Sequence, residues 1–451
     1  MMSQVCIVLT QRQHLRTWIY QGHLNTLAEH FEISLFVPSS LSEVRIQNPR
    51  VKVVSWDFVK EPFWERISQY LLLISHRSNK TFAEKIRKLI LDEQKIHSKS
   101  KLIFAYFKSI RRKPLLYLLH VPLFFRCFDF LYQRHLLKKV VTNIPPSEIY
   151  LVIVSVSDYT TNLVLASLQL NESHVIQIMD NWDNISSKLC PSYLPKKIVV
   201  WSEQTRKHAL EIHAIDSEKV IILGSPRFPN SKIVSNLIGS RQRETTKLSR
   251  KVRIFYAGFF SECNSIESVS ELFKSIERNL PQFEFEFLYR PHPLNIGQNI
   301  EDSDSTWGVS QMSIHNPFID ARNTSGWPIN SDTFYAEMIN CDIVIGTPST
   351  FLLEEILFRV NLILDNRDCT EHYNSARRYF SKSAHFEEII SSDYVRRIDS
   401  TEVSAKKVLE ALERVVELPS ELVNYLVYND EKDYVQRLVE FVNLELSKIK
   451  K

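Results

Sequence analysis

Short apolar runs that alternate with helical or loop segments dominate the first half of this 451-residue chain. The runs lie at Val5–Thr10, Ile33–Val37, Val51–Ser55, Leu151–Val156, Val175–Met179, Ile198–Trp201 and Val220–Leu223. Successive strands of a parallel sheet need a crossover between them, usually a helix, so this alternation predicts a parallel, doubly wound sheet. A second series follows at Val252–Ala257, Phe283–Tyr289, Ile343–Ile345 and Leu362–Leu364. We therefore expect an α/β protein with two Rossmann-like domains, a natural number for this length.

A polar, basic stretch without apolar periodicity, residues 240–251, separates the two series and is the expected linker. The N-terminal domain is then residues 1–239, with a helical insertion at about residues 61–141, where long helical stretches replace the strand pattern. The second domain is residues 252–417. Residues 418–451 carry helical periodicity, and we expect these C-terminal helices to pack back on the first domain. The carboxyl edges of the two sheets are expected to face each other across a cleft.

Composition excludes several classes of protein. The net charge of +4 is too small to indicate a nucleic-acid partner by itself. Only 8 glycines, with no GxGxxG or GxxxxGK[ST] pattern, count against dinucleotide-dependent oxidoreductases and P-loop enzymes. The six cysteines lack metal-ligand spacing, and the first apolar run is too short for a signal peptide. We expect a cytoplasmic protein with reduced cysteines, without a metal site or cofactor.

Two strand ends of the second series carry groups that suit an anion. The strand that begins at Phe283 ends in Arg290 and His292, two donors at its tip. A later strand ends in a tight turn, and a helix follows whose first N–H groups and dipole favour a phosphate. The residues of this turn with the predicted role are Gly346, Ser349 and Thr350. Ligands of open α/β sheets bind at such carboxyl edges, so the pattern predicts a nucleotide diphosphate or phosphodiester site.

Polar loops also follow the strands of the first domain. The loop after Val175–Met179 is dense in side chains that can accept protons or bind hydroxyl groups. Asp158 follows the strand Leu151–Val156, and the loop after the first strand can bind an anionic acceptor. The candidate acceptor-binding residues in these loops are Arg12, His14, Asp180, Asn181 and Trp182. The competing interpretations are Asx turns that cap helices, and ordinary surface solvation.

Four segments together resemble bacterial GT-B glycosyltransferases of the surface-polysaccharide type, similar to CDP-glycerol glycerophosphotransferases and capsule sugar transferases. The segments are Met179–Lys188, Val199–Phe228, the YRPHP motif at 289–293 and Cys341–Glu355. The resemblance implies that the C-terminal domain binds the nucleotide, with Arg290 and His292 on its phosphates and Ser349 and Thr350 capping a helix against them. It also implies that Glu354 or Glu355 binds the ribose hydroxyls. Gly258, after the strand Val252–Ala257, belongs to the same predicted nucleotide site.

The expected activity is metal-independent transfer of a sugar, or a glycerol-phosphate-like unit, from a nucleotide-activated donor to a glycan or lipid-linked glycan acceptor. An inverting transferase needs a general base, and a carboxylate is the usual solution. Asp183 is the first candidate and Asp158 the second. The alternatives are a non-hydrolysing nucleotide-sugar 2-epimerase and a non-catalytic subunit that binds glycan or nucleotide.

A basic and apolar stretch in the insertion suggests a further partner. Residues 101–139 hold nine Lys or Arg and one acidic residue, interleaved with leucines and phenylalanines. This composition suits the surface of an anionic membrane, so we expect a protein that is peripheral on the inner face of the cell membrane. The competing interpretation is a buried helical hairpin with solvated ends.

Overall fold

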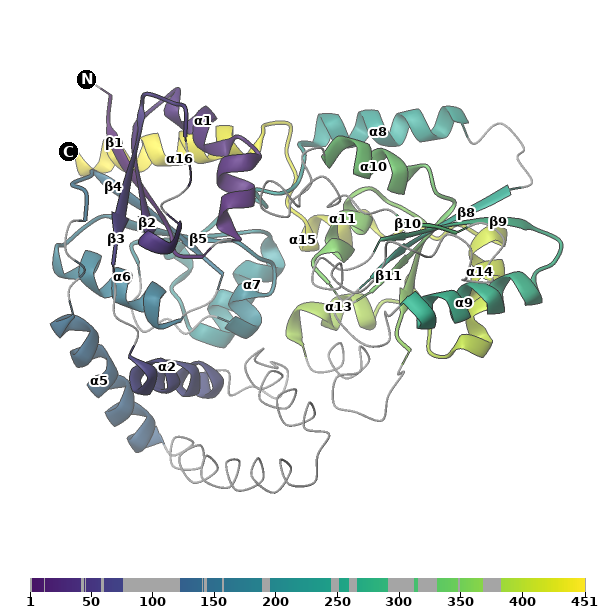
Figure 1. Cartoon of the computed structure of the whole chain (residues 1–451), viewed down its shortest axis with the longest axis horizontal. Helices are drawn as coiled ribbons and strands as arrows, with labels where there is room; N and C mark the ends of the chain where they lie inside the picture. Colours follow the sequence, from purple (N-terminus) through teal and green to yellow (C-terminus); the bar gives the residue numbers. More distant parts are fainter. Residues whose placement is uncertain are drawn as a thin grey trace. The chain divides into compact units, whose positions relative to one another are not determined.

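The structure is a computed structural model, and it describes most of residues 2–450. The residues that it does not describe are 12, 42–43, 45, 58–60, 76–121, 140, 142–143, 156–157, 189–194, 245–250, 259–265, 291–311, 315–330, 348 and 368–382, with the two terminal residues. The chain divides into two compact units (Figure 1). The first unit is Met1–Phe228 with Tyr428–Lys451, and the second is Pro229–Val427.

The first unit is built on a seven-stranded sheet, sheet A, in the order β3-β2-β1-β4-β5-β6-β7. Every neighbouring pair is parallel. The strands are β1 (Gln4–Leu9), β2 (Glu32–Pro38), β3 (Val51–Trp56), β4 (Ile149–Val154), β5 (Val175–Met179), β6 (Lys197–Val200) and β7 (Val220–Ile222). Parallel strands are covered on both faces, which explains why the central strands read as continuous apolar runs rather than alternating ones.

Helices cover both faces of sheet A. They are α1 (His23–Ala28), α2 (Pro62–Ser75), α5 (Pro122–Lys138), α6 (Tyr159–Leu170), α7 (Glu203–His213) and α16 (Tyr434–Ile449), with π-helical turns η1 (Arg16–Tyr20) and η3 (Asn184–Lys188) and short 3-10 turns η2 (Ser39–Leu41) and η4 (Ser217–Lys219). Strand β1 shows the division between the faces, since successive side chains alternate across a strand. Ile7 packs with residues of α1 and α16, whereas Val8 packs with residues of α2, α5 and α6.

Of the expected C-terminal helices at residues 418–451, α16 belongs to the first unit, whereas α15 (Ser420–Leu426) belongs to the second. Helix α16 lies beside α1 (Figure 1). The guanidinium Nε of Arg437 donates to the carbonyl oxygen of Leu223 at 2.8 Å, and His174 Nε2 lies 3.1 Å from Glu445 Oε2. The last helix is thus tied to sheet A by apolar packing and by these polar contacts.

The second unit is built on a six-stranded parallel sheet, sheet B, in the order β10-β9-β8-β11-β12-β13. Its strands are β8 (Lys251–Ala257), β9 (Glu284–Arg290), β10 (Met312–Ile314), β11 (Ile343–Gly346), β12 (Leu362–Asp365) and β13 (Arg396–Ile398). Its helices are α8 (Ser231–Glu244), α9 (Ile266–Asn279), α10 (Ser331–Ile339), α11 (Phe351–Leu357), α13 (Glu387–Ile390), α14 (Ser404–Glu413) and α15 (Ser420–Leu426), with 3-10 turns η9 (Ala384–Phe386) and η10 (Thr401–Val403). Residues of α9 and α14 form a core against this sheet. The prediction of two Rossmann-like parallel sheets is confirmed.

The structure differs from the expected boundaries in three places. The units divide at Phe228–Pro229, before the expected position. Helix α8 occupies residues 240–244 of the expected linker, and β8 begins at its last residue, Lys251. Strands β10 and β13 were not predicted. Of the expected insertion, α2 and α5 are described and residues 76–121 are not. None of the described helices is long and apolar enough to cross a lipid bilayer.

Each sheet contains one point where the chain reverses the direction in which it adds strands. In sheet A this point lies between β1 and β4, and in sheet B between β8 and β11. The loops that leave the two strands at such a point go to opposite faces, so a crevice opens at their carboxyl ends, where ligands of open α/β sheets bind. The topology therefore selects two places at which to examine the predicted site residues.

Candidate functional site

The carboxyl edge of sheet A gathers polar side chains from the loops after β1 and β4. Thr10 Oγ1 lies 3.2 Å from Thr161 Oγ1 in buried surroundings. Gln11 Nε2 donates to Asp158 Oδ2 at 3.2 Å. Side chains that are 147 residues apart in sequence thus meet at the reversal point between β1 and β4.

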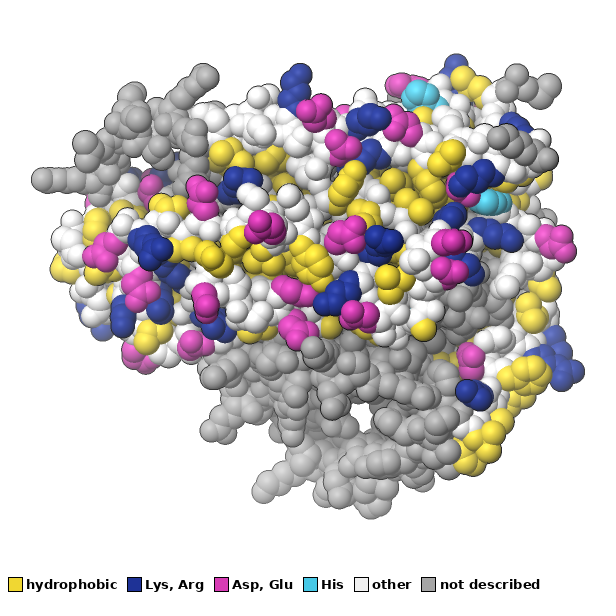
Figure 2. Space-filling model, turned by 180° about the vertical axis from the view of Figure 1, so that it is seen from behind, with side chains coloured by type: hydrophobic (Ala, Val, Ile, Leu, Met, Phe, Trp, Pro, Cys, Tyr) yellow, Lys and Arg dark blue, Asp and Glu magenta, His cyan; other side chains and the backbone are white. Residues whose placement is uncertain are grey.

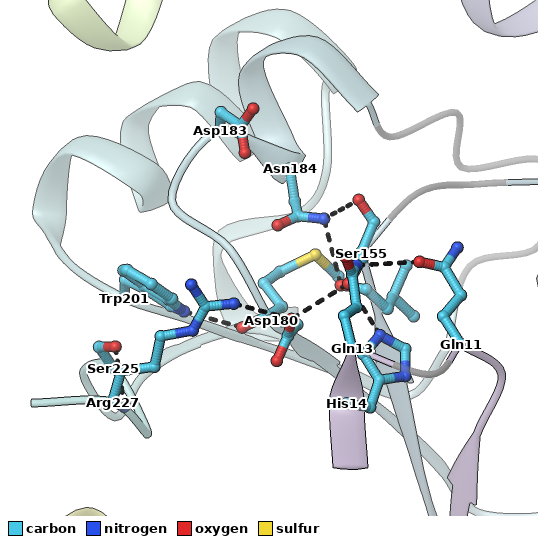
Figure 3. Close-up of polar contacts among 12 residues, drawn as sticks. Gln11, Gln13, His14, Ser155, Asp180, Asp183, Asn184, Trp201, Ser225 and Arg227 are labelled. Atoms are coloured by element: carbon cyan, nitrogen blue, oxygen red, sulfur yellow. Dashed lines mark hydrogen bonds and ion pairs between the residues drawn. The ribbon is translucent and has the colours of Figure 1, made fainter. Parts of the chain in front are cut away.

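A chain of buried hydrogen bonds runs along the same edge (Figure 3). His14 Nε2 lies 2.7 Å from Ser155 Oγ, and Ser155 Oγ donates to Asp180 Oδ2 at 3.1 Å. Arg227 Nη2 forms an ion pair with that same carboxylate oxygen at 3.1 Å. His14 and Asp180 are both fully buried. The segments that follow β1, β4, β5 and β7 therefore contribute one connected network of polar side chains.

The number of protons available in this series of hydrogen bonds determines the tautomer of His14. A serine hydroxyl has one proton, and that of Ser155 is donated to Asp180. Ser155 Oγ must then accept from His14 Nε2, so a neutral imidazole carries its proton on Nε2 and a lone pair on Nδ1. Burial lowers the pKa of His14, against the raising influence of Asp180 and Asp158, which favours this neutral form. Within the described part of the chain, the buried Nδ1 of His14 and Oδ1 of Asp180 have no hydrogen-bond partner.

Asp158 is the N-cap of α6. Its Oδ1 accepts from the backbone N–H of Thr161 at 2.8 Å, while its Oδ2 accepts from Gln11. A capping carboxylate of this kind typically stabilises a helix by about 1 kcal/mol. The capping alternative considered for the polar loops therefore describes Asp158 directly, although the residue also lies at the reversal point of the sheet.

Asp183 lies on a turn that leads into η3, apart from the chain between His14 and Arg227 (Figure 3). Its Oδ2 forms an ion pair with Lys188 Nζ at 2.8 Å, and its backbone carbonyl accepts from the hydroxyl of Ser187 at 2.7 Å. The neighbouring Asn184 contributes its side-chain amide to the carbonyl oxygens of Val154 and Ser155. Asn184 therefore braces the end of β4, whereas Asp183 is held by its own turn.

The other residues that were predicted to bind the acceptor lie in different environments. Trp182 is buried, and its indole N–H donates to Gln204 Oε1 at 2.6 Å. Asn181 is partly exposed, and its backbone carbonyl accepts from the N–H of Asn184 at 3.2 Å. Arg12 lies outside the described residues. The structure thus brings His14, Asp158 and Asp180 together at one sheet edge, while Trp182 packs into the core.

The carboxyl edge of sheet B assembles the second predicted site. Gly258 N–H donates to the carbonyl oxygen of Arg290 at 2.8 Å, which joins the ends of β8 and β9. Thr347 Oγ1 donates to the carbonyl oxygen of Ala257 at 2.8 Å, which joins the ends of β11 and β8. The Arg290 guanidinium lies 4.9 Å from the centre of the Phe351 ring, at the start of α11. This edge includes the reversal point between β8 and β11.

Glu355 has the most unusual environment at this edge. It is fully buried, and neither oxygen of its carboxyl group has a hydrogen-bond partner among the residues that the structure describes. A methyl group built on Gly346 would lie 2.1 Å from Glu355 Oε2, so only glycine leaves room for this carboxyl. Burial raises the pKa of Glu355 well above its ordinary value, nearby Glu354 adds to the rise, and Arg290 opposes it. Glu354, on the adjacent position of α11, is partly exposed.

The turn before α11 departs from the expected capping arrangement. Thr350 is the N-cap of α11 but its side chain makes no capping hydrogen bond, and α11 is only seven residues long. The hydroxyl oxygen of Ser349 is buried, and no described residue forms a hydrogen bond with it. His292 lies outside the described residues. The structure thus places four of the predicted residues at this edge of sheet B: Arg290, Gly346, Ser349 and Glu355. The predicted capping by the Thr350 side chain does not occur.

Two contributors were not identified from the sequence. Ser155 links His14 to Asp180, and Arg227 supplies the positive charge. Arg227 stands in a conspicuous Ser-Pro-Arg turn after a predicted strand, which is the one signal that could have indicated it. Its partner Asp180 is 47 residues away, and pairing over that distance requires the strand order.

No protein-family model matches the chain, and none of the curated proteins matches it in sequence. Several solved structures are similar to it over nearly its whole length. A glycosyltransferase from Rickettsia africae has a TM-score of 0.44 at 12% identity, covering 100% of this chain and 99% of that one. A UDP-GlcNAc 2-epimerase from Neisseria meningitidis, solved with UDP-GlcNAc, has a TM-score of 0.45 at 13% identity, covering 99% and 100%. A variant of the wall teichoic acid polymerase TagF has a TM-score of 0.48 at 8% identity, covering 99% and 89%.

Proposed function

We propose that the chain is a glycosyltransferase that moves a sugar, or a glycerol-phosphate-like unit, from a nucleotide-activated donor to a glycan acceptor. The observation that carries the proposal is the buried carboxyl of Glu355 at the edge of sheet B. A buried polar group without a hydrogen-bond partner costs about 1–3 kcal/mol. Such a cost is expected where a ligand supplies the missing partners, and this carboxyl belongs to the predicted nucleotide site.

The chemistry of this carboxyl suits the vicinal hydroxyls of a ribose. Burial raises the pKa of Glu355 well above its ordinary value, which favours the protonated form of the carboxyl. A protonated carboxyl can donate to one hydroxyl oxygen and accept from the other hydroxyl. The partly exposed Glu354 lacks the buried position, so we assign the ribose to Glu355 and leave Glu354 outside the site.

The phosphates of the donor are assigned to the neighbouring positive charge and donors. Arg290 lies at the tip of β9 close enough to Glu355 to oppose the rise of its pKa. A guanidinium presents several N–H donors in a planar fork that matches phosphate oxygens. The buried hydroxyl of Ser349 is a further donor, and it has no partner among the described residues. His292 keeps its predicted phosphate role as part of the same proposal.

The general base is assigned to the edge of sheet A. His14 Nδ1 carries a lone pair and is buried without a partner in the described part of the first unit. The hydrogen bond from Nε2 to Ser155 orients the ring. At the other end of this series of hydrogen bonds, Arg227 forms an ion pair with Asp180 and fixes its carboxylate. A neutral imidazole in this state can accept the proton of an acceptor hydroxyl, a role that contributes about 10²–10⁴-fold to rate. We therefore place His14 ahead of Asp158, whose carboxylate caps α6, and Asp183, whose carboxylate is paired with Lys188.

The proposal is tested first by nucleotide binding. Thermal melting of the full chain with UDP, GDP, CDP and CMP identifies the nucleotide, since a ligand at 100 times its dissociation constant adds about 2.7 kcal/mol. Arg290→Ala should then weaken the best nucleotide about tenfold to a hundredfold, because a hydrogen bond to a charged group contributes about 1.5–3 kcal/mol. An unchanged affinity in this variant, with the fold intact, removes Arg290 from the site.

Transfer is tested with the donor that carries this nucleotide. His14→Asn should bind the nucleotide normally and lose transfer at least about a hundredfold, whereas Asp183→Asn should stay near the wild-type rate. If Asp183→Asn or Asp158→Asn is the inactive variant instead, the base moves to that residue. Conversion of the donor to its 2-epimer without any acceptor would identify an epimerase and would overturn the assignment as a transferase.

A further inference from the structure

The outward face of α5 is apolar where a surface helix is normally polar. Among the side chains of α5 that the structure describes, five large apolar ones are exposed to solvent: Leu123 at 68%, Phe124 at 42%, Phe130 at 61%, Leu131 at 49% and Leu137 at 38%. A single exposed leucine needs no explanation, but a contiguous exposed patch usually marks an interaction surface. Five such residues on one 17-residue helix form a patch of this kind.

The opposite face of α5 accounts for how the helix is held in the fold. Tyr132 and Leu136 are fully buried in the core below sheet A. The ring of His135 stacks on that of Trp64 in α2, with ring centres 4.2 Å apart. Asn162 of α6 donates its side-chain amide to Tyr132 Oη at 3.2 Å. Since the inner face supplies these contacts, the fold does not require the outward apolar residues.

Basic side chains lie among the exposed apolar ones. Successive residues of a helix are about 100° apart, which places the residues of α5 that are described as exposed within an arc of about 160°. The basic members of this arc are Arg126, Arg134 and Lys138. The only acidic residue of the helix, Asp129, lies outside the arc and accepts from Gln133 Nε2 at 2.8 Å. Figure 2 shows hydrophobic side chains with Lys or Arg beside them along the lower right edge, where α5 lies.

We propose that this face of α5 docks on an anionic lipid surface, with the helix axis parallel to the membrane. Leucine and phenylalanine side chains enter the headgroup region of a bilayer while Arg and Lys contact lipid phosphates, as in interfacial helices. Each basic residue near an anionic bilayer contributes about 1 kcal/mol. At 1.5 Å per residue the helix presents about 25 Å of such surface.

The charge of the face decides between lipid and a second copy of the chain. In a symmetric dimer through α5, two copies of a face with three basic residues and no acid would meet, and like charges at an interface are unfavourable. An anionic bilayer satisfies both the apolar and the basic side chains. The proposal concerns a surface of the first unit and does not rest on nucleotide binding or transfer.

The test is co-sedimentation of the full chain with vesicles of phosphatidylcholine, with and without phosphatidylglycerol. Binding should be stronger to the anionic vesicles and should fall as salt rises, because the Debye length shortens from about 10 Å at 0.1 M to about 3 Å at 1 M. Phe130→Glu should weaken binding to anionic vesicles at least about tenfold. The matched control is Leu444→Glu on α16, where the native side chain is similarly exposed at 54%, and it should bind like wild type.

A probe on the face itself separates this surface from any other basic part of the chain. Cys127 is exposed on the outward arc, whereas Cys6 and Cys341 are buried. With the cysteines at 190, 263 and 369 replaced by serine, a polarity-sensitive fluorophore on Cys127 should shift to the blue when anionic vesicles are added. Equal, weak binding to both kinds of vesicle, unchanged binding of Phe130→Glu, or an unshifted fluorophore on bound protein would each overturn the proposal. So would a dimer in sedimentation that Phe130→Glu dissociates.

Discussion

The carboxyl group of Glu355 makes the stability of the second unit depend on pH in a predictable direction. Burial raises its folded pKa well above the ordinary value of 4.5. Above about pH 4.5 the unfolded chain therefore releases a proton that the folded unit keeps. Stability from this group is fully present below the unfolded pKa and falls as the pH rises toward the folded pKa. The fall is about 1.4 kcal/mol per pH unit for one proton.

Glu355→Gln removes this titration while keeping the shape of the side chain. As the pH rises from the unfolded pKa of about 4.5 toward the raised folded pKa, Glu355→Gln should therefore gain stability relative to wild type. The gain should approach tenfold per pH unit in the equilibrium constant for opening. Hydrogen exchange of peptides from β8, β9 and β11, compared at each pH, reads this quantity within the second unit. The uncharged amide of the variant changes the free energy of unfolding by the same amount at every pH. The dependence of the difference on pH therefore reports the ionisation of Glu355 alone.

Glu354→Gln is the matched control, because it removes the neighbouring and partly exposed carboxylate from the same helix. It should retain most of the wild-type slope. A pH-independent ratio between Glu355→Gln and wild type would mean that the Glu355 carboxyl is ionised in the fold. The argument that it is a neutral donor and acceptor for ribose would then be refuted.

Further predictions concern the glycine against this carboxyl and the ion pair in the first unit. Gly346→Ala should destabilise the second unit by about 1–3 kcal/mol, since its methyl group would overlap Glu355 Oε2. Gly239→Ala in α8 has open space around it and should instead be neutral or stabilise by up to about 1 kcal/mol in urea unfolding. Arg227→Ala leaves the fully buried Asp180 without its cation and should cost about 3–5 kcal/mol, visible in the fluorescence of nearby Trp201 on unfolding. A cost below about 1 kcal/mol would show that solvent reaches Asp180.

Much of the fold follows from the sequence because parallel strands are buried on both faces. All six residues of β4 are buried, and such a run is easily recognised. The missed strands β10 and β13 are three residues long and lie at the two edges of sheet B. Two of the three residues of β13 are arginines, Arg396 and Arg397, so it carries little apolar signal. Helix α8 extends into the polar stretch expected to be a linker, because charged residues such as Arg and Glu are good helix formers.

The sites were predictable as regions, but the sequence could not choose among their residues. Strand ends indicated where polar groups gather, and His14 and Asp180 do lie at one edge. Which acidic residue of α11 turns inward depends on the packing of that helix against β11, where Gly346 leaves space for one carboxyl. The tautomer of His14 depends on a serine, Ser155, that is 141 residues away in sequence. Such information appears only once the strand order is known.

The central claim is that Glu355 binds the ribose of a nucleotide donor. The most direct test measures the dissociation constants of the best-binding ribonucleoside diphosphate and of its 2′,3′-dideoxy analogue, for wild type, Glu355→Met and Glu354→Met. Two hydrogen bonds at about 0.5–1.5 kcal/mol each predict that wild type and Glu354→Met prefer the ribonucleotide by about tenfold to a hundredfold. Glu355→Met should lose this preference, since methionine keeps the length of the side chain but neither donates nor accepts strongly. An equal preference in all three proteins, or none in wild type, would contradict the account.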